Sequence, residues 1–378
     1  MRELPCCADA GTPGCSSAWL ERCVWDAEVR RFESGHPDRG PRIAGPLSFA
    51  HSPTSLVDSL AVVVDAPYLP AEGVRTARGP AVGYLMVAGS AALFAINGTL
   101  AKIVLESGIT PFRLTQARCA GALIGLGLIV LVTRPASLRT SPRELAFLAL
   151  FGVCGVAFVQ LFYFAAIAHL QIGISLLIQY TAPLLVALWA RFVFKEHVRR
   201  RVWLALGLAL VGMSVMVDLW GGVPLNSLGV TLSLVSACTF AAYLLLAEHA
   251  VSRRDPISLL VYGFFFASLF WAIVQPWWSF PFDDVTDHIS LLGNLADSQL
   301  PTWVLMLTIV LVGTIVPFIL MVGSLQHLPA TTVGMVAMLE PVLGALVAYL
   351  WLGESLAAQQ LIGGAIVLAA IFLAQTSR

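Results

Sequence analysis

Charge is scarce in this sequence, and lysine is nearly absent. Only 12% of the 378 residues are charged, against about a quarter in a soluble domain. Basic and acidic residues balance at 22 each, which argues against a nucleic-acid partner. Lysine occurs only at Lys102 and Lys195, and this arginine-rich usage favours a GC-rich, bacterial genome.

The motifs of common catalytic and metal chemistry are also absent. None of the seven cysteines has the C-x-x-C spacing of a zinc or redox site, so we predict no metal site and no cofactor. A P-loop, H-E-x-x-H and G-x-S-x-G are missing, which leaves ATP-driven pumping and the familiar hydrolases unsupported. We therefore do not predict an enzyme.

Long apolar runs dominate what is present. Hydrophobic residues make up 58% of the chain, and from Pro80 onward many apolar runs approach the ~20 residues that span a hydrocarbon core. The runs are continuous, unlike the short alternating segments of an outer-membrane barrel. We predict an all-α integral membrane protein with ten transmembrane helices, at 81–104, 114–132, 145–168, 172–194, 202–219, 230–250, 258–277, 302–324, 331–352 and 360–374.

Residues 1–79 differ from the rest. They hold eight arginines and ten acidic residues, and many Pro, Gly and Ser. No stretch has the pattern of a secretory signal peptide. We expect a disordered cytoplasmic extension, and translation from a later start, near Val74 or Val82, is an alternative.

The basic residues of the short loops predict the orientation. They gather in the loops after the second, fourth and sixth predicted helices: Arg134, Arg139, Arg143, Lys195, Arg199, Arg200, Arg201, Arg253 and Arg254. The opposite side has Lys102 and Arg113, and its long loop after the seventh helix is acidic. We therefore predict both termini in the cytoplasm and a multi-pass protein of the bacterial inner membrane.

The chain also repeats itself. Residues 169–196 align without a gap on residues 327–354, at an offset of 158. The aligned pairs include a His, a Pro and a Glu, at His169 and His327, Pro183 and Pro341, and Glu196 and Glu354. A weaker echo joins SAALFA at 90–95 to SACTFA at 236–241. We therefore predict two repeats, 81–219 and 227–375, of five helices each.

Five helices are an odd number, so the second copy must be inverted relative to the first. Inverted repeats are typical of secondary transporters, which bind substrate near the bilayer midplane where the halves meet. Matched His169 and His327 fit turn geometry better than proton chemistry.

Two segments carry a resemblance to a known family. TAPLLVALWARFVFKE (181–196) and LEPVLGALVAYLWLGE (339–354), with Arg118, resemble the EamA-type transporters of the drug/metabolite transporter superfamily. The likeness covers about residues 81–375. It implies ten helices, both termini inside, a central cavity, and transport, often export, of small metabolites such as amino acids or toxic compounds. The second half has no arginine that matches Arg118.

Glu340 is the strongest candidate site residue. A carboxylate inside a membrane costs at least ~2.5 kcal/mol at a helix centre, so it is normally paired or wet. Its repeat counterpart is Ala182, so packing symmetry does not require it. We expect Glu340 to face the cavity near Gln179 and Tyr180 and to contact a substrate or a coupling proton; a structural acid is the alternative. Pro341 should kink its helix.

Further polar residues are expected to line the same cavity if the resemblance holds. Each is also a candidate for an interhelical hydrogen bond. The substrate-binding set is Glu340, Gln179, Tyr180, Gln160, Tyr163, Asn97 and Tyr243, and the structural set is Pro183, Pro341 and Arg118.

We therefore predict a secondary transporter that exports small metabolites by alternating access, with the lipid bilayer and a small-molecule substrate as partners; a homodimer is left open. One rival is a magnesium-dependent prenyltransferase-like enzyme, because DDVTD at 283–287 has D-D-x-x-D spacing. A solvated acidic loop explains that motif better. A non-transporting membrane scaffold is the third alternative.

Overall fold

The computed structural model describes residues 79–170, 172–220, 226–282, 285–353 and 355–375. The predicted disorder of residues 1–79 lies outside this range except for Gly79, and so do Asp283 and Asp284 of the acidic motif.

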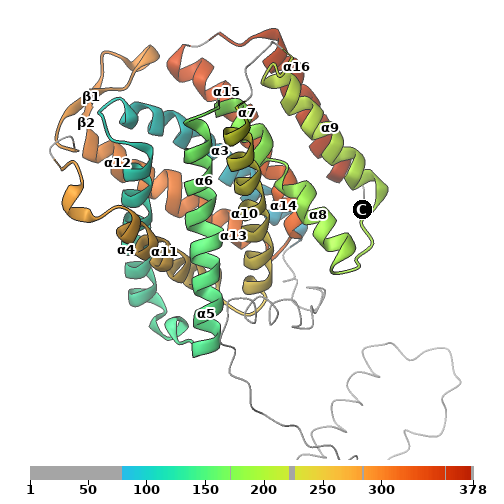
Figure 1. The fold of residues 1–378 in the computed structure, drawn as a ribbon, viewed down its shortest axis with the longest axis horizontal. Coiled ribbons are helices and arrows are strands. Elements are labelled where there is room, and N and C mark those ends of the chain that lie inside the picture. The colour runs from blue at the N-terminus through green and yellow to red at the C-terminus, as the bar shows by residue number, and fades with distance from the viewer. Residues whose placement is uncertain (1–78, 171, 221–225, 283–284, 354, 376–378) are drawn as a thin grey trace, which may run out of the picture. The chain divides into compact units, whose positions relative to one another are not determined.

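Helices make up most of the described chain (Figure 1). The first half contains α3 (Pro80–Leu105), α4 (Pro111–Thr133), η2 (Pro135–Leu138), α5 (Pro142–Leu150), η3 (Phe151–Ala157), α6 (Phe158–Ile167), α7 (Ile172–Gln179), α8 (Ala182–Phe192) and α9 (Arg200–Met216). The second half contains α10 (Ser227–Val251), α11 (Pro256–Val274), η4 (Trp277–Ser279), β1 (His288–Ser290), η6 (Gly293–Leu295), β2 (Gln299–Pro301), α12 (Thr302–Val310), η7 (Leu311–Ile315), α13 (Val316–Ser324), α14 (Ala330–Ala337), α15 (Leu339–Val347), η8 (Ala348–Leu352) and α16 (Ala358–Gln375).

Eight helical segments are long and apolar enough to cross a membrane, by length and composition. Each predicted range contains a helix, but α9 has 17 residues and the apolar part of α16, Ala358–Ala374, is also short. Large apolar side chains face outward on the spans; Val132, for example, is 83% exposed. Soluble proteins rarely expose apolar surface so widely, and the fold is that of an all-α membrane protein.

Two of the spans are broken at equivalent positions. The helical pattern is interrupted at Tyr180 and Thr181 between α7 and α8, and at Met338 between α14 and α15. Tyr180 and Met338 are 158 positions apart, as are the prolines that follow them. A proline lacks the N–H that would bond the carbonyl four residues earlier. The predicted kinks are therefore present in both copies, as breaks.

Matched contacts join the two halves. Ser90 Oγ in α3 donates to the Pro317 carbonyl in α13 at 2.9 Å, and Ser236 Oγ in α10 donates to the Val159 carbonyl in α6 at 3.1 Å. The serines occupy equivalent positions of the repeat, and so do the two acceptors. The first helix of each half thus bonds to the third helical span of the other half.

The turns at His169–Leu170 and His327–Leu328 also make matched contacts between the halves. A Cβ on Gly83 would lie 2.7 Å from the Leu328 side chain, and a Cβ on Gly229 would lie 2.6 Å from the Leu170 side chain. Each turn therefore fits against a glycine of the opposite half, which explains the repeated His-Leu pairs as packing.

The last helix of each half forms a crossed pair. Figure 1 shows α9 and α16 side by side. They touch at Gly212 and Gly363, where a Cβ on Gly212 would lie 2.8 Å from the Gly363 carbonyl oxygen. Only a residue without a side chain allows two backbones to approach so closely.

A short hairpin follows α11 and was not predicted. Strands β1 and β2 pair antiparallel with Ile289 opposite Leu300. The hairpin region holds the end of η8, because Trp351 Nε1 donates to the Leu291 carbonyl at 3.0 Å. The hairpin that follows α11 therefore contacts the end of η8.

Candidate functional site

A partly open cavity of about 410 Å³ lies among helices of both halves. Residues of α3, α7, α9, α15 and α16 surround it, with Val217 just after α9. The described residues that line it are Phe94, Ala95, Gly98, Gly173, Leu176, Met213, Met216, Val217, Glu340, Pro341, Gly344 and Gln360.

The lining is apolar apart from two side chains. Glu340 is the only charged residue among the described residues of the wall, and Gln360 adds a neutral amide. Gln360 Oε1 already accepts a hydrogen bond from the Ala357 N–H at 3.1 Å. Small-molecule sites commonly combine such an apolar wall with a few fixed polar groups.

Glu340 enters the cavity from the first turn of α15, immediately after the break at Met338. Tyr180 Oη, at the equivalent break in the first half, donates to Glu340 Oε2 at 2.7 Å. Tyr180 is 4% exposed, whereas Glu340 is half-buried. The expected proximity of Glu340 to Tyr180 is thus present, and the hydrogen bond leaves Oε1 without a donor among the described residues.

Aromatic rings lie behind this pair and reach the cavity wall. Tyr180 meets Phe240 edge to face, with ring centroids 6.1 Å apart, and Phe240 stacks on Tyr243 at 6.2 Å. Tyr243 meets Phe318, which meets Phe94 at 5.4 Å. Phe94 itself lines the cavity. The rings come from both halves, and Phe240 packs directly against the Tyr180 ring.

The two glutamines predicted in the first half lie outside the cavity wall. Gln179 Nε2 donates to Ser236 Oγ at 3.0 Å, so it ties α7 to α10. Gln160 Oε1 is buried and has no partner among the described residues. The Gln179 side chain therefore belongs to the packing between the halves.

The other predicted polar residues do not line the wall either, although Tyr163 interacts through space with Glu340. Asn97 and Tyr243 occupy equivalent positions of the repeat, both are buried, and neither Asn97 Oδ1 nor the Tyr243 hydroxyl has a partner among the described residues. Tyr163 is half-buried beside Phe164, at 5.4 Å between ring centroids. Of the predicted substrate-binding set, Glu340 alone is among the described residues that line the cavity. Tyr180 does not line it but donates a hydrogen bond to Glu340.

Arg118 ties two spans together. Its Nε donates to Thr314 Oγ1 at 3.0 Å and its Nη2 to the Gly313 carbonyl at 3.2 Å, both in η7. The residue is 8% exposed. No ion pair joins Arg118 to Glu340 in the described part of the chain, although the two charges interact through space. Arg118 therefore bonds helices and does not line the cavity.

Sequence reasoning missed most of the wall. Met213, Met216 and Val217 come from the end of α9, and Gln360 comes from the start of α16. These are ordinary residues of apolar or terminal helix segments, and neither helix belongs to the aligned 169–196 and 327–354 pair. The one available signal was the small-residue spacing that lets α9 and α16 cross.

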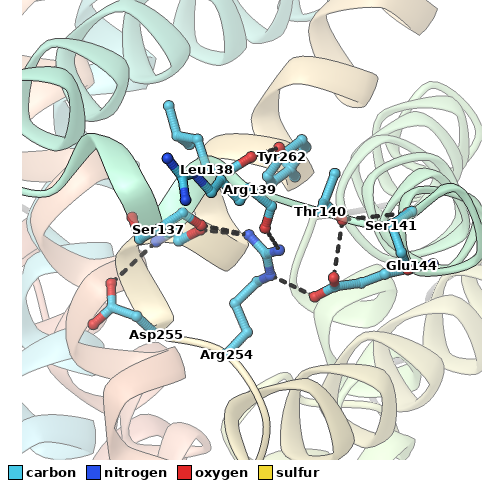
Figure 2. A network of polar contacts seen from close by, with 10 residues as sticks. Ser137, Leu138, Arg139, Thr140, Ser141, Glu144, Arg254, Asp255 and Tyr262 are labelled. Atoms are coloured by element: carbon cyan, nitrogen blue, oxygen red, sulfur yellow. Dashed lines mark hydrogen bonds and ion pairs between the residues drawn. The ribbon is translucent and has the colours of Figure 1, made fainter.

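A second polar cluster lies away from the cavity, centred on Arg254 (Figure 2). The guanidinium donates to Glu144 Oε1 at 2.8 Å, to the Ser137 and Arg139 carbonyls at 2.9 Å each, and to Ser258 Oγ at 2.7 Å. Its side chain is 8% exposed. The cluster fastens the segment between α4 and α5 to the turn between α10 and α11.

Arg113 makes the reciprocal contact at the opposite ends of α4 and α11. Its Nη1 donates to the Pro276 carbonyl at 3.1 Å, and its Nη2 donates to Ser279 Oγ at 2.6 Å. Arg113 lies in the first turn of α4 and binds the segment after α11. Arg254 lies just before α11 and binds the segment after α4. The α4–α11 pair is clamped at both ends.

The acidic motif of the enzyme alternative is only partly described. Asp283 and Asp284 lie outside the described residues. Within the described ranges, no group of three or more His, Cys, Asp or Glu side chains is placed to hold a metal ion.

Comparison with known proteins gives a family and a fold. The profile of the EamA-like transporter family matches twice, at residues 81–218 and 227–376. An uncharacterized transporter of Archaeoglobus fulgidus is 27% identical over 61% of this chain and 76% of its own length. The threonine/homoserine exporter RhtA of Escherichia coli K12 is 26% identical over 72% of this chain and 83% of its own. A protein of known crystal structure, 17% identical, superposes with a TM-score of 0.62 over 78% of this chain and 97% of its own.

Proposed function

Because the chain belongs to the EamA-like transporter family, we propose that it is a secondary transporter that exports small metabolites, such as amino acids or drug-like compounds, across the bacterial inner membrane. The single observation that carries this proposal is the cavity that both halves enclose, with one carboxylate in its wall. The name of RhtA supports export as the direction. The family match favours this function over the prenyltransferase-like and scaffold alternatives.

The proposed architecture is ten helices in two inverted halves, 81–219 and 227–375, with both termini in the cytoplasm. The reciprocal Ser90 and Ser236 bonds support a two-fold relation between the halves. Five spans per half would make that relation an inversion. Reporter fusions should read cytoplasmic at Arg139, Arg199 and Arg253 and external at Asp284. An internal reading at Asp284 would break the scheme.

The proposed mechanism is alternating access by rocking of the halves, without ATP. The two broken spans support it, because the break at Tyr180 and the break at Met338 meet beside the cavity.

Proteoliposomes containing the purified protein test this function. We expect solute movement above protein-free liposomes without ATP, measured with and without a pH gradient. Metabolite profiling of an overexpressing strain should identify the compounds that accumulate outside the cell. Magnesium-dependent prenyl transfer by the same preparation, with no solute movement, would contradict the proposal and favour the enzyme.

A further inference from the structure

The charges of the cavity wall are one-sided. Glu340 is the one side chain able to carry a charge among the described residues of the wall, where no lysine, arginine or histidine occurs. A substrate cation would therefore find a partner, whereas a substrate carboxylate would be desolvated without one. An unpaired charge in such a place is costly.

Arg118 does not supply the missing positive partner. Its guanidinium already donates to Thr314 Oγ1 and to the Gly313 carbonyl, and it lies outside the wall. Turning it toward the cavity would break both of these hydrogen bonds. A free amino acid carries one charge of each sign, so this cavity can pair only half of it.

The carboxylate is prepared for one cation. The buried Tyr180 hydroxyl holds Glu340 Oε2 at 2.7 Å, which orients the group and leaves Oε1 available. An ammonium group is a natural donor to that oxygen, in a charge-assisted hydrogen bond. Phe94 in the same wall adds an aromatic ring, and the face of such a ring attracts cations.

The rest of the wall suits an apolar body. Leu176, Met213, Met216 and Val217 are the larger aliphatic and thioether side chains of the wall, and methionine adapts to irregular shapes. About 410 Å³ falls in the range of small-molecule sites, roughly 300–1,000 Å³. The cavity is therefore larger and more apolar than a short polar amino acid requires.

We propose that this cavity selects amphipathic organic amines, with one ammonium group on an apolar or aromatic body and no carboxylate, over zwitterionic amino acids. Glu340 Oε1 accepts the ammonium hydrogen bond, and Phe94 and the methionines contact the body. This inference rests on the proposed transport function and names the substrate class of the same cavity.

Matched probe pairs test the selectivity by direct binding to the purified protein. The pairs are phenethylamine with phenylalanine and tryptamine with tryptophan, which differ only by the carboxylate. Calorimetry at about pH 8 keeps the amino group of a primary alkylamine protonated. We expect each amine to bind at least tenfold more tightly than its amino acid. Equal or tighter binding of the amino acids, or no binding of either amine by folded protein, overturns the proposal.

Variants assign the preference to the cavity. Glu340→Gln should remove most of it, while Glu106→Gln, at an exposed end of α3, should leave it intact. An unchanged preference in Glu340→Gln overturns the role given to that carboxylate. Should that variant not fold, Gly344→Lys gives a second test, because a Cβ on this lining residue meets nothing within 4 Å. The added cation should weaken amine binding at least tenfold, Gly344→Ala should not, and unchanged amine binding by the lysine variant contradicts the proposal.

Efflux of labelled tryptamine from proteoliposomes, against protein-free liposomes, separates the two proposals. Selective amine binding without efflux would contradict transport and leave the selectivity standing. Movement of other solutes by a protein that shows no amine preference would contradict the selectivity alone.

Discussion

The two halves of this protein share their packing devices and differ in their polar side chains. Reciprocal serine bonds, matched glycine contacts and equivalent helix breaks occur in both. Glu340, in contrast, stands where the first half has Ala182, and Tyr180 stands where the second half has Met338. The contacts that occur in both halves are packing contacts that stabilise the fold. The hydrogen-bonded pair at the cavity is not repeated, because the second half supplies the acid, Glu340, and the first half supplies its donor, Tyr180.

Arg118 is another residue that the two halves do not share. It binds η7 of the second half, yet the second half has no equivalent arginine. Its contacts are helix–helix bonds, so asymmetry alone does not make a residue part of the cavity. Position in the wall and asymmetry together distinguish Glu340.

Among the packing contacts, the contact between α9 and α16 should lose the most stability when it is disrupted. In Gly212→Leu the new side chain meets the Gly363 backbone, and we expect a loss of ~3 kcal/mol or more in the free energy of unfolding. Gly207→Leu in the same helix is the matched control, because a Cβ there meets nothing within 4 Å. Denaturant unfolding in detergent measures both. Equal stabilities would show that the crossing does not hold the halves together.

The Arg254 cluster should come next. Arg254→Ala removes a donor to four oxygens from a side chain that is 8% exposed, and we expect a loss of about 2–3 kcal/mol. Arg134→Ala breaks the pair with Asp255, in which the arginine is 65% exposed, and should cost at most about 1 kcal/mol. The same unfolding measurement compares them. A larger effect for Arg134 would contradict the account of this interface.

The reciprocal serines should give the smallest and most similar effects. Ser90→Ala removes one buried hydrogen bond and should cost about 1 kcal/mol. Ser236→Ala should cost slightly more, because Ser236 Oγ also accepts from Gln179 Nε2. In a Gln179→Leu background the difference should vanish, which a double-mutant cycle of unfolding measures. Persistence of the difference would mean that the two bonds are not equivalent.

Much of the fold could be predicted from residue patterns. Apolar runs located the helices, and Pro183 and Pro341 located the breaks, since a missing N–H has a local consequence. The alignment of residues 169–196 with residues 327–354 identified equivalent residues but not the residues that they contact. Gly83 packs on Leu328, and Gly229 packs on Leu170. These contacts depend on which helices of the two halves pack together, and local sequence does not encode that choice.

The site was predictable only where chemistry is unusual for a membrane interior. Glu340 could be proposed because a carboxylate is costly there, and helix spacing placed Gln179, with its neighbour Tyr180, near the equivalent position Ala182. Met213, Met216 and Gln360 could not be identified, because such residues occur throughout the chain and reach the cavity only through the α9–α16 crossing. The short strands β1 and β2 have too few residues for a recognisable alternation.

Transport by Glu340→Gln in proteoliposomes tests the central claim most directly. The substitution keeps the size of the side chain and removes its charge. With the rate divided by the amount of folded protein, and thermal unfolding measured on the same preparation, we predict transport at least several-fold below the unsubstituted protein and a melting temperature close to it. Normal transport at every pH tested, with or without a loss of stability, would contradict the claim and leave Glu340 as a structural acid.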